Sequence, residues 1–471
     1  MYVHGVGVGV PTLRVATADI DAGWDRSGRR GQVAVCAPDE DVLTLSWAAA
    51  TMALAEAGID AADVDGLWWG TTRPPYAEGP SHAVLIDALG LDAGAAGCIT
   101  SGSTHAGMDA LLAAADAVAA GSAGTALVIA ADALRPGLGT GYEARCGAAA
   151  VALVLRADTG PAAIGARTSF ARPFLDRYRG DGETDTRDVY DGRLFREEVF
   201  VPIVTEAARR LTADAGDGSN TPSWSLPDPD GRLAAAVARK VGADPKTLAS
   251  AGAYTALGDT GAAAALVGLV GALASPGTAH AIGYGGGRAS GVTITATAAV
   301  PGAGAAQRAL EEAGRPTTYA ALLRARNQLT PNGETIPMGV PPESAMFTRG
   351  ADEMLQLLGG RCVDCGTIST PPSIHPHCIA CGGPKLEPVA LAREGTVHTY
   401  VVNHTMPAPF EAPLPIAVID LDDGARVMLQ VADDGTNVEI GRRMRLVLRK
   451  YAHERGVPVY GYKALPMKEG S

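Results

Sequence analysis

Residues 361–383 read RCVDCGTISTPPSIHPHCIACGG and contain two Cys-x-x-Cys pairs separated by twelve residues. Each pair offers two thiolates to one metal ion, and four thiolates complete the tetrahedral shell of a structural zinc site. A glycine follows each pair, where the chain must turn tightly. The spacing therefore predicts one structural Zn2+ bound by Cys362, Cys365, Cys378 and Cys381. The two histidines between the pairs are alternative ligands, but four cysteines already complete the shell.

The residues after this motif form short apolar segments separated by turn signals, at 395–404, 414–423, 425–433 and 442–450. Strands of this length and spacing predict a small β-barrel. Before the motif, residues 301–350 are rich in Pro, Gly and charge, and we expect a linker with short helices there.

Residues 1–300 alternate apolar strand-like segments with helical segments. We expect strands at 66–72, 125–132, 148–155, 278–287 and 291–300, and helices near 42–57, 106–120, 198–212, 231–241 and 261–274. This alternation predicts a layered α/β domain. The order strand, loop, apolar helix, strand occurs near 95–132 and near 253–284. It indicates two quasi-repeated halves, about 1–158 and 159–300.

The composition argues against several classes of protein. The formal net charge is −12, from 39 basic and 51 acidic residues, which disfavours binding to nucleic acid or to an anionic membrane. No unbroken apolar run of about 18 residues is present, so we expect no membrane span. The N-terminal MYVHGVGVGV lacks the features of a signal peptide. Seven cysteines, four of them clustered, favour a metal site in the reducing cytoplasm over disulfides.

Five stretches within residues 345–465 match a known module: RCVDCG, PPSIHPHCIACGG, GTVHTYVVNH, PIAVIDLDDGARVMLQV and IGRRMRLVLR. Through them the segment resembles the acyl-CoA-associated zinc-ribbon/OB-fold family, formerly domain of unknown function 35. The resemblance implies a zinc ribbon at 351–388 and an OB-fold barrel at 389–471. It also implies pairing with, or fusion to, a thiolase-fold protein. OB barrels elsewhere often bind nucleic acid, but the acidic balance disfavours that here.

Seven stretches of residues 1–300 occur in the order and spacing of a second family. They are MYVHGVGVGVPTLRV, AGIDAADVDGLWWGTT, THAGMDALLAAADAVAAG, RCGAAAVALVL, GRLAAAVARKVG, LGDTGAAAALVGL and YGGGRASG. The segment resembles the thiolase superfamily, in particular hydroxymethylglutaryl-CoA synthase and ketoacyl-ACP synthase III. The resemblance implies a five-layered αβαβα fold, dimerisation through its core, and a coenzyme A thioester as substrate.

The catalytic set of that superfamily is replaced in this sequence. The family uses a nucleophilic cysteine at the central helix, a histidine and an asparagine that polarise the thioester carbonyl, and in some members an acid–base glutamate. Matched residue by residue, these positions fall on Thr104, Pro227, Asp259 and Thr72. Gly285–Gly287, which line the acyl site in the family, are retained, and we predict that they bind substrate.

Other side chains could supply the missing chemistry. His105 is a candidate general base, Asp228 and Asp259 are candidate carboxylate bases, and Tyr254 is a candidate hydroxyl donor. Each also has a structural interpretation, as a helix-terminus, cap or core residue. The catalytic candidates are therefore Thr104, His105, Asp228 and Asp259. Cys98, which precedes Thr104 by six residues, is interpreted as a plain buried cysteine.

We expect a thiolase-superfamily acyl-CoA protein involved in forming or cleaving C–C bonds on a CoA thioester. One alternative is a catalytically silent scaffold subunit of a thiolase or synthase complex. Another is a retro-aldolase, which needs a base and an oxyanion site but no acyl-enzyme cysteine. A transferase that uses Thr104 is less favoured, because threonine is a poor nucleophile without a base. The expected partners are acyl-CoA and either a second copy or a second thiolase-fold subunit.

Overall fold

The computed structural model describes residues 1–188, 191–215, 221–249, 251–329, 350–406, 412–432, 438–454 and 457–467. Two compact units make up the chain, Met1–His82 with Leu91–Thr330 and Ala83–Gly90 with Pro331–Ser471. In the described ranges, no helix has the length and apolar character needed to cross a membrane.

A nine-stranded sheet is the frame of the first unit, with the order β11-β12-β13-β8-β1-β7-β6-β4-β5. Its strands are β1 (Tyr2–Gly9), β4 (Gly66–Gly70), β5 (Ala96–Thr100), β6 (Thr125–Ala133), β7 (Ala148–Arg156), β8 (Ala162–Ala171), β11 (Ser223–Ser225), β12 (Gly277–Gly285) and β13 (Arg288–Ala296). Strand β1 pairs with β7 along its length, but with β8 through Tyr2 and Val3. The sheet therefore has two halves joined by a short seam.

The two halves repeat one topology. Strands β4 and β6 are parallel, and β7 runs antiparallel to β6. In the other half β11 and β12 are parallel, and β13 runs antiparallel to β12. Helix α4 (Ala106–Ala119) precedes β6, and helix α9 (Ala264–Ala272) precedes β12.

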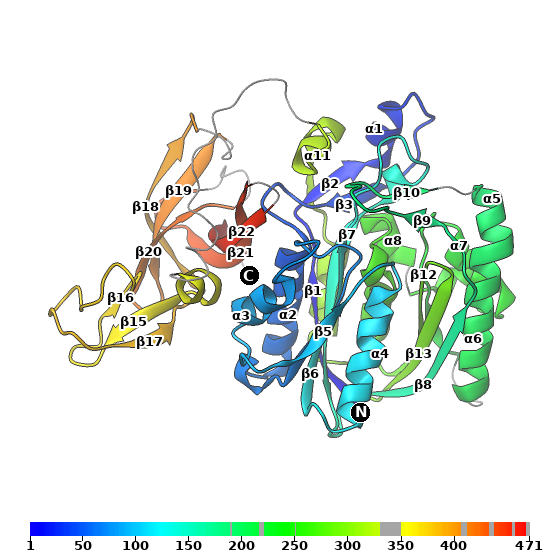
Figure 1. Ribbon diagram of the computed structural model, residues 1–471, viewed down its shortest axis with the longest axis horizontal. Coiled ribbons are helices and arrows are strands. Elements are labelled where there is room, and N and C mark those ends of the chain that lie inside the picture. Colours follow the sequence, from blue (N-terminus) through cyan, green and yellow to red (C-terminus); the bar gives the residue numbers. More distant parts are fainter. Residues whose placement is uncertain are drawn as a thin grey trace. The chain divides into compact units, whose positions relative to one another are not determined.

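Helices form three layers around the two half-sheets (Figure 1). Helices α4 and α9 contact each other and strands of both halves, so they form the central layer. Helices α2 (Val42–Ala57) and α10 (Ala303–Glu311) pack on β1, and α6 (Val201–Ala215) packs on β8 and β13. The predicted αβαβα layering is confirmed. The apolar sequence of α9 fits its place in the centre, where Ala265–Val270 are buried.

Local sequence signals explain the tight packing of α2 on β1. The carboxylate of Asp41 caps the helix by accepting hydrogen bonds from two amides of its first turn. Gly5, Gly7 and Gly9 of β1 face this helix. A Cβ at these positions would lie 2.5, 2.2 and 2.1 Å from carbonyl oxygens of α2. Larger residues there would push the helix off the sheet.

Smaller elements account for the remaining α-helices and β-strands of residues 1–329. The strands are β2 (Leu13–Ala16), β3 (Gln32–Val35), β9 (Arg177–Tyr178), β10 (Arg187–Asp188) and β14 (Arg315–Pro316). The helices are α1 (Thr17–Ala22), α3 (Ser81–Leu89), α5 (Gly192–Leu194), α7 (Leu233–Lys240), α8 (Ala251–Leu257) and α11 (Tyr319–Ala325). Residues 301–329 of the expected linker cluster with the first unit. Its remainder, 330–349, lies outside the described residues.

The second unit contains a ribbon and a barrel. The ribbon has the order β16-β15-β17, with β15 (Leu358–Cys362), β16 (Ile368–Ser369) and β17 (Leu386–Ala390). The barrel has the order β20-β19-β18-β21-β22, with β18 (Glu394–Asn403), β19 (Leu414–Leu421), β20 (Arg426–Gln430), β21 (Arg443–Glu454) and β22 (Val457–Pro466). A bridge from Val431 to Ala464 brings the two ends of this sheet together. Strand β22 was not predicted, because its prolines and central glycine weaken the strand signal.

Candidate functional site

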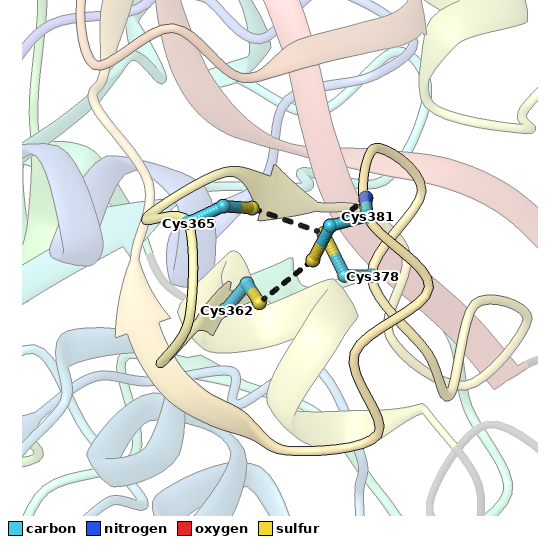
Figure 2. A group of neighbouring side chains, drawn as sticks. All are labelled: Cys362, Cys365, Cys378 and Cys381. Carbon is cyan, nitrogen blue, oxygen red and sulfur yellow. Dashed lines mark hydrogen bonds between the residues drawn. The ribbon is translucent and has the colours of Figure 1, made fainter.

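Four cysteine sulfurs converge in the ribbon (Figure 2). All four Sγ atoms lie within 4.8 Å of one another. The closest pairs are Cys362 with Cys381, at 3.6 Å, and Cys365 with Cys378, at 3.5 Å. Four sulfurs bound at about 2.3 Å to one tetrahedral zinc ion would be about 3.8 Å apart. The predicted ligands therefore have the spacing that one zinc ion requires.

The backbone around these cysteines also suits a metal thiolate. Gly366 and Gly382, which follow the two Cys-x-x-Cys pairs, have φ angles of 75° and 74°. A residue with a side chain would be strained in this left-handed conformation. Backbone hydrogen bonds, that of Cys381 first, lower the pKa of Cys378, whereas the amide of Gly383 opposes a rise in the pKa of Cys381 but the neighbouring thiols raise it overall. A lower pKa favours the thiolate, which is the form that binds zinc. Among the described residues the cluster contains the four cysteines and neither intervening histidine.

The predicted nucleophile position lies just before the central helix α4. The Oγ1 of Thr104 donates a hydrogen bond to the carbonyl oxygen of Tyr284 at 2.7 Å. A Cβ at Gly285 would lie 2.7 Å from this Oγ1 and 2.5 Å from the amide nitrogen of His105. Gly286–Gly287 continue as a left-handed turn, with φ angles of 57° and 77°. Thr104 and the predicted substrate-binding glycines thus lie together, with the hydroxyl engaged by the backbone.

The ring of His105 is held by its own helix. The residue is 1% exposed, and its Nδ1 lies 2.8 Å from Oδ2 of Asp109, one turn further on. The other oxygen of Asp109 pairs with Arg288 at 3.0 Å. Burial opposes the charge on Asp109, but the hydrogen bond to His105 and the charge of Arg288 lower the pKa of Asp109. The Nε2 of His105 is buried without a hydrogen-bond partner in the described part of the chain.

Asp259 lies at the predicted position of the carbonyl-polarising asparagine, and its carboxylate forms an ion pair with an arginine. The side chain is 4% exposed, and Oδ2 lies 2.7 Å from Nη1 of Arg177. Oδ1 accepts a hydrogen bond from the amide of Gly261 at 3.0 Å. Burial opposes the charge of Arg177, but Asp259 raises the pKa of Arg177 overall. The two groups therefore form a charged pair with little access to solvent.

Asp228 lines a small cavity together with Asp259 and Tyr254. The water-accessible volume is about 20 Å³, room for a single water molecule. Burial and the charge of Asp230 raise the pKa of Asp228 to about 6. Burial also raises the pKa of Tyr254 above its usual range, which keeps its hydroxyl neutral. The cavity thus holds a carboxyl group that titrates near neutral pH.

Asp132 is a fully buried carboxylate at the end of β6 that the sequence did not single out. Its Oδ1 accepts hydrogen bonds from the amide and hydroxyl of Thr72, at 2.9 and 2.7 Å, and from the hydroxyl of Thr71 at 3.1 Å. Its Oδ2 accepts one from the amide of Ala262 at 2.7 Å. Burial raises the pKa of Asp132 to about 6, although these bonds oppose the shift. Thr72, the predicted glutamate position, is therefore part of a link between β4, β6 and the turn before α9.

Comparisons with known proteins agree with the second unit's fold. Residues 388–449 match a family model described as ChsH2, C-terminal OB-fold domain. A DUF35 domain-containing scaffold protein of Methanothermobacter thermautotrophicus is 35% identical over 130 residues, which are 26% of this chain and 96% of that protein. The chain belongs to the DUF35 family.

The first unit of this DUF35 chain is similar to hydroxymethylglutaryl-CoA synthases over a longer stretch. A hydroxymethylglutaryl-CoA synthase of Methanosphaera stadtmanae is 27% identical over 248 residues, which are 51% of this chain and 71% of that protein. The solved structure of MvaS in complex with 3-hydroxy-3-methylglutaryl coenzyme A has a TM-score of 0.60 at 20% identity, covering 72% of this chain and 94% of that one. The predicted fusion of a thiolase-like domain to a zinc-ribbon/OB-fold domain is confirmed.

The catalytic candidates of this DUF35 protein fall into three contact groups. Thr104 contacts Gly285, His105 binds a carboxylate of its own helix, and Asp228 shares a cavity with Asp259. Their roles in catalysis stay predictions.

Three further groups were missed or misjudged from the sequence. Asp109 could have been found, because it follows His105 at the helical i,i+4 spacing. Arg177 gave no signal, since 82 residues separate it from Asp259. The interpretation of Cys98 as buried was wrong, because β5 is the last strand in the sheet order and this residue is exposed.

Proposed function

We propose that this chain is a scaffold subunit of a thiolase-type complex acting on a CoA thioester, and that its own thiolase-like unit does not transfer acyl groups. The observation that carries this proposal is that the predicted catalytic positions are engaged within the protein. The hydroxyls of Thr72 and Thr104 donate to Asp132 and to a backbone carbonyl, and Asp259 is paired with Arg177.

Acyl transfer makes demands that these groups meet poorly. It needs an activated nucleophile and hydrogen-bond donors aimed at the developing oxyanion. Pro227 has no polar side-chain atom, and the carboxylate of Asp259 would repel an oxyanion where an amide would stabilise it. The cavity beside Asp259 has room for a water molecule and not for an acyl chain.

The second unit supplies the scaffold in this proposal. The relative described above is named a scaffold protein, and four cysteines would fill the coordination shell of zinc. A closed shell leaves no position for a substrate, so the ion would stabilise the ribbon. Cysteines that bind a metal and do not form disulfides are typical of a reducing compartment such as the cytoplasm.

A partner is expected at strand β5, the end of the nine-stranded order. Ala96, Gly97 and Cys98 are exposed there. An edge strand presents unpaired backbone groups to which another strand can pair. We propose that a second copy of this chain, or a thiolase-fold subunit with an intact cysteine, binds at this edge.

Affinity purification from the native host, followed by mass spectrometry, tests the scaffold. We expect a stoichiometric thiolase-fold partner with an active-site cysteine, and acyl-CoA turnover by the complex alone. Cys98→Arg should release the partner, whereas Ala120→Arg, an exposed control at the end of α4, should not. Turnover of an acyl-CoA at an enzymatic rate by the isolated chain would contradict the proposal.

A second candidate is a retro-aldolase, favoured by the raised pKa of Asp228 beside Tyr254. The Asp228 carboxylate would take the proton of a β-hydroxyl, and the Cα–Cβ bond would break. The hydroxyl carbon becomes an aldehyde or ketone, and the electron pair forms a thioester enolate that is then protonated. The small cavity would have to open for this substrate.

Asp228→Asn distinguishes the two candidates. A retro-aldolase should lose cleavage of a β-hydroxyacyl-CoA in this variant and keep it in Asp244→Asn, a helix-cap change elsewhere in the same unit. Equal cleavage by both variants would rule out Asp228 as the base.

A further inference from the structure

Two loops that follow the carboxyl ends of strands β4 and β6 in the first unit contain arginines that the proposed function does not use. Strands β4 and β6 pair in parallel, so the loops that leave their carboxyl ends start side by side. Arg73 lies in the first loop and Arg135 in the second. Arg179 comes from the turn between β9 and β10, which is tied to this edge because the amide of Thr186 donates to the carbonyl oxygen of Arg135 at 3.0 Å.

Positive charge exceeds negative charge in this group. Asp185 pairs with Nε of Arg135 at 2.5 Å, and the carboxylate of Asp132 is already bound by hydroxyls and amides. Burial lowers the pKa of Arg73 to about 10, and the charges of Arg179 and Arg135 act in the same direction, whereas the charges of Asp185 and Asp132 oppose the shift. Arg73 still carries its charge at neutral pH. The three guanidinium groups therefore outnumber the two nearby carboxylates, Asp185 and Asp132. This local excess of positive charge contrasts with the net charge of −12 for the whole chain.

One nitrogen of the Arg73 guanidinium group also lacks an acceptor. Its Nη2 is buried and has no hydrogen-bond partner among the residues described. A buried donor left unpaired is costly, and a buried charge without a partner is more so. An oxyanion would supply both the acceptor and the compensating charge. The planar fork of a guanidinium group suits the two oxygens of a carboxylate or phosphate.

We propose that Arg73, with Arg135 and Arg179, binds an oxyanion, either the carboxylate of an acidic acyl group or a phosphate. Both ligands present negatively charged oxygens at the spacing of the guanidinium fork. The site does not depend on the scaffold proposal, because it requires no chemistry at Thr104 or Asp259. Its test measures binding and not turnover, so either proposal can fail without the other.

Calorimetric titration of the full-length protein with sodium glutarate and with inorganic phosphate, at constant ionic strength, tests the site. We expect saturable binding of at least one anion. Arg73→Gln should weaken it about tenfold or more, as expected for the loss of a charge-assisted pair. Arg193→Gln is the matched control, since that side chain is 79% exposed and pairs with Glu197 on the surface.

The outcomes separate the two sources of the oxyanion. Saturation by glutarate alone assigns the site to a carboxylate, and saturation by phosphate alone assigns it to a phosphate. If Arg73→Gln does not fold, Arg135→Gln is expected to weaken binding in the same way. The proposal is overturned if neither anion saturates the protein up to about 20 mM, or if the variants bind as tightly as Arg193→Gln.

Discussion

The ion pair between Arg177 and Asp259 can be tested by removing one partner. Arg177→Gln leaves the Asp259 carboxylate 4% exposed, with one amide donor. At 2.7 Å the charges attract by about 6 kcal/mol at an effective dielectric constant of about 20. Desolvation cancels part of this attraction, and breaking buried pairs costs about 3–5 kcal/mol. We therefore expect the free energy of unfolding to fall by about 3 kcal/mol.

Tryptophan emission during denaturation with urea measures this loss selectively. The chain has five tryptophans, and the last is Trp224, so all of them report on the first unit. The control is Arg196→Gln, which removes an exposed pair with Glu197. That change should leave the urea midpoint almost unchanged, because solvent screens exposed charges.

The double variant Arg177→Gln/Asp259→Asn completes the test. It removes both charges, so its loss of unfolding free energy should be smaller than the sum of the losses in the two single variants. A loss below about 1 kcal/mol for Arg177→Gln, with no coupling in the double variant, would refute a formed and buried pair. Asp259 would then be available as a base, and the case for a silent unit would weaken.

Three further predictions concern other parts of the molecule. The purified protein should contain one zinc per chain by atomic emission, and Cys365→Ser should release it to a chromogenic chelator; a metal-free wild type would contradict the site. Gly285→Ala should lower the stability of the first unit by about 1–3 kcal/mol, because its Cβ would lie 2.5 Å from a backbone nitrogen; an unchanged urea midpoint would count against this packing. The pKa of Asp228 is raised from 3.8 to about 6, so ionisation opposes folding, and stability should fall as pH rises across that interval. Asp228→Asn should flatten this part of the pH profile, and an unaltered profile would show that Asp228 is not its cause.

The sequence alone determined the features that depend on short-range spacing. The zinc ligands were predicted because each Cys-x-x-Cys pair fixes its own geometry within a tight turn. Strands β4, β6, β7, β12 and β13 followed from apolar periodicity, which the backbone imposes locally, whereas β8 and β11 were not predicted. The sequence also predicted that the catalytic set is replaced, from the identity of the residues at 72, 104, 227 and 259, and this matching stays a prediction.

The tertiary structure alone decided which partners the residues at these positions contact. Thr72 is bound by Asp132, 60 residues away, and Asp259 by Arg177, 82 residues away. Such contacts form where the two half-sheets and their loops meet, and no local pattern in the chain encodes which partner arrives there. The exposure of each side chain also depends on the tertiary structure. Cys98 is exposed because its strand is the last in the sheet order, and the pKa of Asp228 is raised because the folded chain buries it. A side chain's charge and access to solvent depend on neighbours that only folding brings together.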